Sequence, residues 1–312
     1  MRIAVYGAGA VGAYFGGRLA QAGEEVIFIA RGEQLAALQT QGLRVESIAG
    51  DFTVQPVQAT ANPATIGPVD LVIVAVKTWQ IPAVAEAMRP LIGPETLVLP
   101  LQNGVEAPSQ LAAVLGQQHV LGGSCVIIAA VVGPGQIRHS GANPVIRMGA
   151  LDNTRSARLE RVLHSFTQAQ GMTAEIVDDI NVALWQKFLL IATWSGLGAV
   201  TRAPIYTICR QPETRALLIA AMQEIHAIGL AHGVALPPTL VADTLATIEN
   251  LPAGATASMQ RDIMQGRPSE LEAQTGAVVR LGQAVGIATP VNRFIYQSLF
   301  LLEQKARGQL EF

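Results

Sequence analysis

The stretch Val5–Gly32, VYGAGAVGAYFGGRLAQAGEEVIFIARG, decides the fold of the first half of the chain. It reads as a short apolar strand, a glycine turn, a helix and a second apolar strand, and the turn contains Gly7, Gly9 and Gly12. Glycines at this spacing, between a strand and a helix, let backbone N–H groups and the positive helix end approach a pyrophosphate. The pattern therefore predicts dinucleotide binding, although a structural turn, an FAD site or an adenosylmethionine site can have the same spacing.

The residue that follows the second strand indicates which dinucleotide. In NAD-binding proteins, an Asp or Glu about 20 residues after the glycine turn hydrogen-bonds the ribose 2′-hydroxyl. This sequence has Arg31 at that place. An acid would repel a 2′-phosphate, whereas a guanidinium pairs with it through charge-assisted hydrogen bonds. Arg31 therefore predicts NADP(H) as the cofactor, and the alternative is a solvated surface arginine.

The first half of the chain alternates apolar runs with helical patterns, which is typical of a parallel sheet with crossover helices. Four runs are apolar on both faces and predict buried parallel strands: residues 3–6, 26–30, 71–76 and 96–101. Residues 43–60 resemble a hairpin around Gly50-Asp51. Further strands are expected between Val120 and Met148, and the run that ends at Asp178 is the last with strand character.

From Asp179 onward the sequence reads as helices that are separated by Gly and Pro. The first of them, Ile180–Thr201, is apolar nearly all round, so we expect it to be the buried centre of a helical domain. The predicted fold class is α/β, with a Rossmann-type dinucleotide-binding domain over residues 1–178. An all-helical C-terminal domain over residues 179–312 would carry the substrate site.

The composition is that of an ordinary globular protein and excludes several functions. The chain has 312 residues, 50% of them apolar, and a formal net charge of -2 with scattered basic residues, so nucleic acid is not an expected partner. Its two cysteines and five histidines show no metal-ligand spacing, and no metal is expected. The longest uncharged stretch, residues 120–135, is too short and too rich in Gly and Pro for a membrane span. These features favour a cytoplasmic protein.

Two polar signals follow the carboxyl ends of predicted strands. Lys77 comes after the strand in LVIVAVKTWQ, and Asn103 comes after the strand in LVLPLQNGV. Ligands bind outside the carboxyl ends of the strands in open α/β sheets. We therefore expect the glycine turn, Arg31, Lys77 and Asn103 to face one site. Taken alone, Lys77 could be an exposed loop lysine and Asn103 part of a simple turn.

Three residues of the second half are candidates for catalysis or substrate binding. Lys187 is the only charge in its apolar helix, and an ammonium removed from water gives up its proton more readily, which suits a general acid. The alternative is a lysine that reaches solvent from a partly exposed face. Ser258 lies four residues before Asp262, on the same face if the segment is helical. Glu270 follows Pro268 in a first helical turn, where the helix dipole alone favours an acid.

With these residues identified, the chain resembles the ketopantoate reductase (2-dehydropantoate 2-reductase) family, NADPH-dependent enzymes of pantothenate biosynthesis. The resemblance runs from Met1 to about Gln304. It rests on the order of five motifs: GAGAVG with Arg31, VAVKTWQ, LQNGV, LWQKF, and SMQRDIMQGRPSELE with the following GIATPVN. Five motifs in order across both halves are far more specific than the glycine turn alone.

The resemblance implies a reaction and a role for each matched residue. Hydride would pass from nicotinamide C4 to the ketone carbon of 2-dehydropantoate, with Lys187 as the general acid at the ketone oxygen. Glu270 would interact with the substrate hydroxyl and keep the site ordered. Asn103 and Lys77 would lie by the nicotinamide and the substrate, and Ser258 would contact the substrate carboxylate.

Three positions depart from the family pattern. Ile191 and Ser195 stand where asparagines typically follow the catalytic lysine, and Ala255 stands where another asparagine precedes the serine. Losing such contacts leaves substrate polar groups unpaired, at about 1–3 kcal/mol for each buried group. We still expect Ser195 to bind substrate.

Two alternatives to 2-dehydropantoate reduction stay open. One is an NADPH-dependent reductase of a different, less polar 2-oxoacid, which Ile191 favours. The other is an NADP(H)-sensing module without turnover, which the presence of both Lys187 and Glu270 disfavours. The expected partner is a small-molecule 2-oxoacid, and a homodimer stays open.

Overall fold

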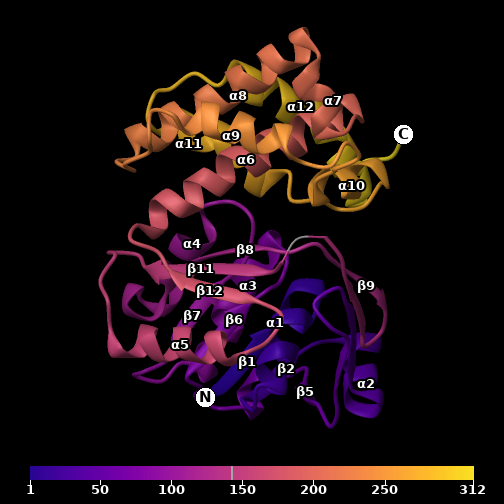
Figure 1. Ribbon diagram of the computed structural model, residues 1–312, viewed down its shortest axis with the longest axis vertical. Helices are drawn as coiled ribbons and strands as arrows, with labels where there is room; N and C mark the ends of the chain where they lie inside the picture. Colours follow the sequence, from indigo (N-terminus) through magenta and orange to yellow (C-terminus); the bar gives the residue numbers. More distant parts are fainter. Residues whose placement is uncertain (142) are drawn as a thin grey trace. The chain divides into compact units, whose positions relative to one another are not determined.

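The four apolar runs of the first half form parallel strands of one sheet, as predicted, and a short fifth strand joins them (Figure 1). The computed structural model describes residues 1–141 and 143–312. The strands of this sheet, in the spatial order β5-β2-β1-β6-β7, are β1 (Arg2–Tyr6), β2 (Glu25–Ile29), β5 (Gln58–Thr60), β6 (Leu71–Val74) and β7 (Leu97–Pro100). β2 lies on one side of β1 and β6 lies on the other. The glycine turn, which follows β1, is therefore at the point where the strand order reverses.

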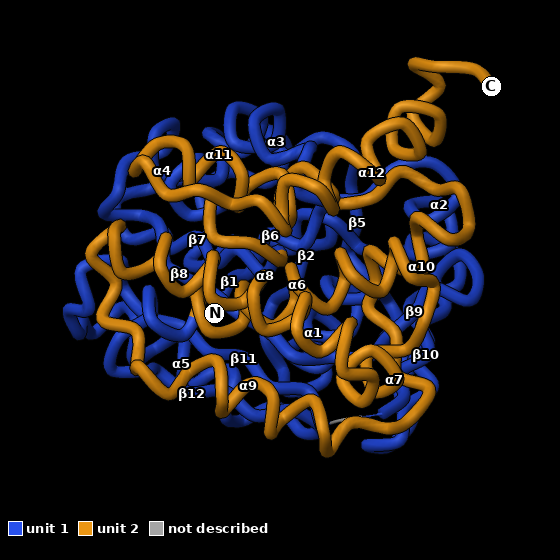
Figure 2. Tube along the Cα trace, turned by 90° about the horizontal axis from the view of Figure 1, so that it is seen from above, with its two compact units in different colours: residues 1–102, 107–183 blue, residues 103–106, 184–312 orange. Residues whose placement is uncertain are grey.

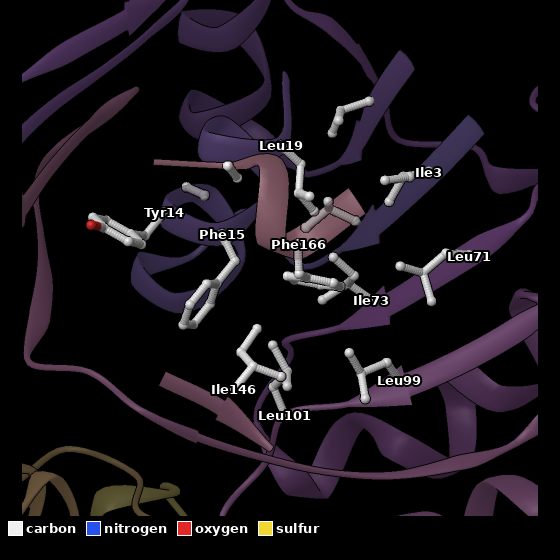
Figure 3. Packing of buried hydrophobic residues seen from close by; sticks show 14 of the residues in the cluster. Ile3, Tyr14, Phe15, Leu19, Leu71, Ile73, Leu99, Leu101, Ile146 and Phe166 are labelled. Atoms are coloured by element: carbon white, nitrogen blue, oxygen red, sulfur yellow. The ribbon is translucent and has the colours of Figure 1, made fainter. Parts of the chain in front are cut away.

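Both faces of the central strands are buried, because helices cover the sheet on two sides. The crossover helices are α1 (Ala10–Gln21), α2 (Gly32–Gln41), α3 (Ile81–Ala87) and α4 (Ala107–Leu115), and α5 (Ala157–Gln168) follows later. Short 3-10 turns lie at η1 (Pro63–Thr65), η2 (Thr78–Gln80), η3 (Arg89–Leu91) and η4 (Gln117–His119). Figure 3 shows one of the two resulting cores, in which side chains of β1, β6 and β7 meet those of α1 and α5: Ile3, Ile73, Leu99, Phe15, Leu19 and Phe166.

The predicted hairpin over residues 43–60 is only partly right. β3 (Leu43–Ser47) and β4 (Phe52–Val54) pair antiparallel as expected, but β5 leaves the hairpin and pairs parallel with β2. Pro56 stands between β4 and β5, and a proline has no N–H for a continuous ladder. The hairpin joins β10 (Gln136–His139) and β9 (Ala129–Gly133) in a second sheet, and β8 (Leu121–Val126), β11 (Val145–Ala150) and β12 (Thr173–Ile176) form a third.

Among the described residues, every regular element after β12 is helical, as predicted. The elements are α6 (Ile180–Thr201), α7 (Ile205–Arg210), α8 (Pro212–Ala231), α9 (Leu240–Glu249), α10 (Ser258–Met264), the π-helix η5 (Glu272–Gly276), α11 (Ala277–Ala284) and α12 (Pro290–Ala306). The predicted bounds of α6 are confirmed. In the part of the chain that the structure describes, no helix is both long and apolar enough to cross a bilayer.

The described residues cluster into two compact units, and the division does not follow the sequence simply. Unit 1 contains Met1–Gln102 and Ala107–Ala183, and unit 2 contains Leu184–Phe312 together with Asn103–Glu106 (Figure 2). The longer division therefore falls inside α6, a little after residue 178. A short segment next to β7 thus belongs to the helical unit.

Candidate active site

The three glycines of the turn are required for different reasons. Gly7 has a φ of +102°, and a Cβ there would lie 2.9 Å from the Ala75 carbonyl carbon. A Cβ on Gly12 would lie 2.1 Å from the Gly7 carbonyl oxygen, so the packing of the turn itself requires this glycine. Gly9 is exposed, and a Cβ there would have no atom of another described segment within 4 Å.

The open space beside Gly9 lies at the start of α1. Gly9 is the N-cap of that helix, and no side chain caps the N–H groups of the first turn. Helix N-termini with uncapped N–H groups favour phosphate oxygens. Packing against other protein segments does not explain the glycine at position 9, whereas room for a pyrophosphate at the helix N-terminus does.

Arg31 lies just after β2 and is exposed, as the cofactor prediction requires. Its guanidinium acts on the hydroxyl of Tyr6, the last residue of β1, through its positive charge. Burial raises the pKa of the Tyr6 phenol, and the charge and hydrogen bond of Arg31 lower it in part. We did not identify Tyr6 from the sequence, although a hydroxyl that directly precedes the glycine turn is a usable signal.

Lys77 follows β6, which is the other neighbour of β1. The side chain is exposed, and its Nζ lies 5.9 Å from the centroid of the Trp79 ring. The amide of Gln102 donates to the carbonyls of Val74 (2.9 Å) and Val76 (3.0 Å), so the end of β7 is joined to the end of β6. The glycine turn, Arg31 and Lys77 therefore follow three adjacent strand ends in unit 1.

Asn103 and Glu270 meet within unit 2. The amide nitrogen Nδ2 of Asn103 lies 3.4 Å from Oε2 of Glu270, which is only 7% exposed. Gly104 has a φ of +96°, and a Cβ there would lie 2.7 Å from the Ala273 carbonyl oxygen. This close approach requires glycine and seats the segment against the turn that begins at Glu270.

Lys187 lies on α6 and is partly buried. Ile191 and Ser195 follow it at one and two helical turns, so the three residues share a helix face. This face carries one cation, one apolar side chain and one hydroxyl. Lys187 at one end of this face and Ser195 at the other can therefore each bind a polar group of a substrate.

The hydroxyl of Ser195 differs from the others on α6. Thr193 donates to the Leu189 carbonyl and Thr201 donates to the Leu197 carbonyl, each at 2.7 Å. Ser195 is fully buried, and its Oγ has no hydrogen-bond partner among the described residues. Buried polar groups are normally paired, so this hydroxyl is suited to a ligand.

Two glycines of α6 let other elements pack closely on this helix. A Cβ on Gly196 would lie 2.9 Å from the Thr275 side chain and 2.8 Å from Ile295. A Cβ on Gly198 would lie 2.5 Å from the Gln260 amide. The π-helix η5, α12 and α10 therefore contact the helix that carries Lys187.

The remaining substrate candidate is Ser258, the first residue of α10, and its side chain is exposed. Asp262, one turn later, forms an ion pair with Arg267 at 2.6 Å. The predicted shared face of Ser258 and Asp262 is confirmed, but the aspartate has a structural partner. Of the two, only Ser258 stays a candidate.

Two buried polar residues near Glu270 were missed in the sequence. Gln274 lies one turn after Glu270 and is fully buried, and neither of its side-chain amide atoms has a hydrogen-bond partner among the residues that the structure describes. Glu303 occupies a core position of α12, in line with the buried Ile295 and Leu299. A charged residue on the apolar face of a helix is the signal that could have identified Glu303. Within the described residues, no group of His, Cys, Asp and Glu could hold a metal ion.

Comparison with known proteins gives consistent matches over nearly the whole chain. The family model described as ketopantoate reductase PanE/ApbA matches residues 3–153, and the model of its C terminal part matches residues 179–303. A 2-dehydropantoate 2-reductase from Nostoc sp. (strain PCC 7120) is 31% identical over 319 residues, which cover 99% of this chain and 98% of the relative.

Solved structures share the fold at similar coverage. A PanE/ApbA family ketopantoate reductase from Ralstonia eutropha JMP134 has a TM-score of 0.87 and 34% identity, covering 98% of this chain and 100% of that one. A D-mandelate dehydrogenase solved with NADH and anilino(oxo)acetate has a TM-score of 0.89 at 23% identity, with coverage of 98% and 100%. The second likeness shows a shared fold only.

Proposed function

The chain belongs to the ketopantoate reductase family, and on that premise we propose that it reduces 2-dehydropantoate to pantoate with NADPH. The observation that carries the proposal is the pairing of Asn103 with Glu270 in unit 2, on elements that pack against the helix of Lys187. An amide and a carboxylate, in the unit that also contains the partly buried Lys187, match the polar groups of a hydroxylated 2-oxoacid.

NADP(H) is the cofactor of the proposed reaction. The open space at Gly9 and the uncapped start of α1 accommodate a pyrophosphate, and Arg31 pairs with a 2′-phosphate. The Tyr6 phenol next to this guanidinium is a neutral group and leaves its charge available to the phosphate. When bound, the cofactor supplies the hydride that the ketone carbon accepts.

Lys187 is the proton donor in this mechanism. As the ketone carbon accepts hydride, negative charge develops on its oxygen, and the Lys187 ammonium gives one proton to that oxygen. The product is a hydroxyl group and a neutral lysine, which regains its proton from solvent. The apolar surroundings of α6 strengthen the interaction between the ammonium and the developing charge.

The remaining candidates bind and orient the substrate. Glu270 accepts a hydrogen bond from the substrate hydroxyl. The Asn103 amide donates to the Glu270 carboxylate and holds that side chain in place. Ser258 contacts the substrate carboxylate. Ser195 offers its unpaired buried hydroxyl to a polar substrate group.

A second candidate function is reduction of a 2-oxoacid with a less polar side chain. Ile191 places an apolar, partly buried side chain between Lys187 and Ser195 on the face of α6 that these residues share. A D-mandelate dehydrogenase of the same fold was solved with anilino(oxo)acetate, an aromatic 2-oxoacid derivative. Here Lys187, Glu270 and the cofactor keep their roles, and only the side-chain pocket differs.

The deciding experiment follows NADPH oxidation by absorbance with purified protein. The substrates are 2-dehydropantoate and a panel of 2-oxoacids with alkyl and aromatic side chains, with NADH in place of NADPH as the cofactor control. The highest kcat/KM on 2-dehydropantoate supports the first function. A higher value on an apolar 2-oxoacid supports the second, and no turnover of any 2-oxoacid refutes both.

A further inference from the structure

Every polar group of Ser269, the residue directly before Glu270, is held by one pair of side chains. Its backbone N–H donates to the Glu303 carboxylate, at 3.0 Å from Oε1 and 3.1 Å from Oε2, and its hydroxyl donates to Oε2 at 2.5 Å. Its carbonyl accepts from Nη2 of Arg307 at 3.0 Å. The backbone on the N-terminal side of Glu270 therefore has little freedom.

Glu303 and Arg307 are neighbours on α12, one helical turn apart. Glu303 is 2% exposed, and its Oε1 lies 2.7 Å from Nη2 of Arg307. A carboxylate this deeply buried is costly unless it is paired and hydrogen-bonded. Here a cation, a hydroxyl and a backbone N–H satisfy it together, so packing alone does not explain the choice of an acid.

Ser269 transmits this constraint into the turn that carries Glu270. Its Oγ accepts from the Leu271 backbone N–H at 3.3 Å, which closes a local side-chain-to-backbone turn around Glu270. The Glu270 carbonyl then accepts from Ala273 and Gln274 at 3.1 and 3.0 Å. The backbone of Glu270 is thus restrained by Ser269 on one side and by a hydrogen-bonded helical turn on the other.

The turn is also held after Glu270. Tyr296 of α12 donates to Oε1 of Glu272 at 2.5 Å, and Arg280 donates to Oε2 at 3.0 Å. These partners are more exposed than Glu303. The buried attachment therefore lies on the N-terminal side, next to the candidate catalytic acid.

We propose that Glu303 is a positioning residue for the reaction: through Ser269 it holds Glu270 at Asn103, and Arg307 pairs with its carboxylate in the core. This inference rests on the proposed function, because it assigns Glu270 to the substrate. Glu303 itself touches no substrate. Its role is to keep the backbone of residue 269 in one conformation.

Glu224 provides a matched control within the same unit. Its carboxylate accepts from the backbone N–H groups of Val291 (2.8 Å) and Asn292 (3.0 Å), and so caps the other end of α12. It resembles Glu303 in chemistry but holds no residue next to a site candidate. Glu224→Gln therefore measures what loss of a capping carboxylate costs the fold alone.

The test compares Glu303→Gln, Glu224→Gln and Glu270→Gln in the full chain, on the 2-oxoacid that wild type reduces best. We expect Glu303→Gln to lower kcat by on the order of 10- to 100-fold through misplacement of Glu270. The Kd for NADPH should stay unchanged, and the pH profile of kcat/KM should change as it does in Glu270→Gln. Glu224→Gln should lower the melting temperature without changing kcat or the pH profile. The double variant of Glu303 and Glu270 should be no slower than Glu270→Gln.

Ser269→Ala covers the case in which Glu303→Gln does not fold. It removes only the hydroxyl link and should lower kcat by a few-fold with the same change of pH profile. If Glu270→Gln is impaired but the folded variant, Glu303→Gln or Ser269→Ala, has normal kcat, the role of Glu303 is refuted and the proposed function stands. Normal turnover in Glu270→Gln overturns the role of that acid in the proposed mechanism, and a wild type inactive on every 2-oxoacid overturns the proposed function. In both cases the inference falls with it.

Discussion

The glycine turn of unit 1 and the region around Glu270 in unit 2 are both candidates for ligand binding, but they are constructed by opposite means. The turn uses backbone atoms of neighbouring residues and leaves an open space at Gly9. The Glu270 region collects side chains from distant segments, and a buried acid on α12 holds one of them in place. The difference teaches that a local motif carries its own geometry, whereas a dispersed group of side chains depends on support from distant segments, such as that of Glu303.

The largest effect should come from the dispersed site. Lys187→Ala removes the proton donor and should lower kcat by about 10²- to 10⁴-fold, because general acid catalysis contributes that much. NADPH affinity should hardly change, since the candidates for the pyrophosphate and the 2′-phosphate, Gly9 and Arg31, lie in unit 1. Steady-state kinetics and cofactor titration measure the two quantities, with the exposed Lys305→Ala as the control. A fully active Lys187→Ala protein removes this residue from the mechanism.

The next effect should separate the two cofactors. Arg31→Ala removes charge-assisted hydrogen bonds of about 1.5–3 kcal/mol, so NADPH affinity should fall by roughly 10- to 150-fold while NADH affinity stays constant. Tyr6→Phe, which leaves the charge but removes the hydroxyl partner, should give a smaller loss in the same direction. Fluorescence titration with both cofactors provides the measurement. Equal losses for NADPH and NADH would refute the 2′-phosphate role.

A third effect should divide the glycine turn into fold and ligand positions. Gly12→Ala forces a Cβ to 2.1 Å from the Gly7 carbonyl oxygen and should destabilise the fold by about 1–3 kcal/mol. Gly9→Ala meets no protein atom, so it should leave stability within about 0.5 kcal/mol and weaken NADPH binding instead. Urea unfolding and cofactor titration of both variants check this. A Gly9→Ala protein that binds NADPH normally would show that the open space is not used.

The smallest effect concerns the hydrogen bond from Tyr296 to Glu272 and its contribution to stability at high pH. Burial, and then the hydrogen bond to Glu272, raises the pKa of Tyr296 to about 12 from 10.0. The folded state thus holds this proton more tightly than the unfolded state, so the contribution is full below pH 10 and is lost as the pH rises to about 12. Tyr296→Phe should reduce the alkaline loss of stability in urea unfolding at about pH 9 and about pH 11. An unchanged slope would mean that the tyrosine contributes nothing there.

The parts of the fold that could be predicted from the sequence are those in which neighbouring residues carry the signal. The strands β1, β2, β6 and β7 are apolar runs with clear ends, and the place of Arg31 follows from the strand that precedes it. The long helix α6 was likewise evident from its own residues. The pairing of β5 with β2 was not, because a three-residue strand has too few side chains to show a pattern.

The candidate site could be predicted only residue by residue. Lys187 and Glu270 were evident as charges in apolar or helix-starting contexts, but their common support was not. Glu303 comes 34 residues after Ser269, with η5 and α11 between them, and its role depends on α12 folding back onto that residue. Asn103 follows a strand of unit 1, and nothing in LQNGV indicates that it belongs with the helices.

The membership of Asn103–Glu106 in unit 2 limits how far the two halves of such proteins can be exchanged. Arg280 binds Glu106 at 2.8 Å and Glu272 at 3.0 Å, so this segment must be compatible with the helices of its own chain. A chimera joined near residue 178 would combine an Asn103–Glu106 segment from one parent with a Glu270 turn from the other. Recombination between relatives should therefore preserve activity only when the crossover carries both segments from the same parent, and substrate specificity should be inherited from the two together.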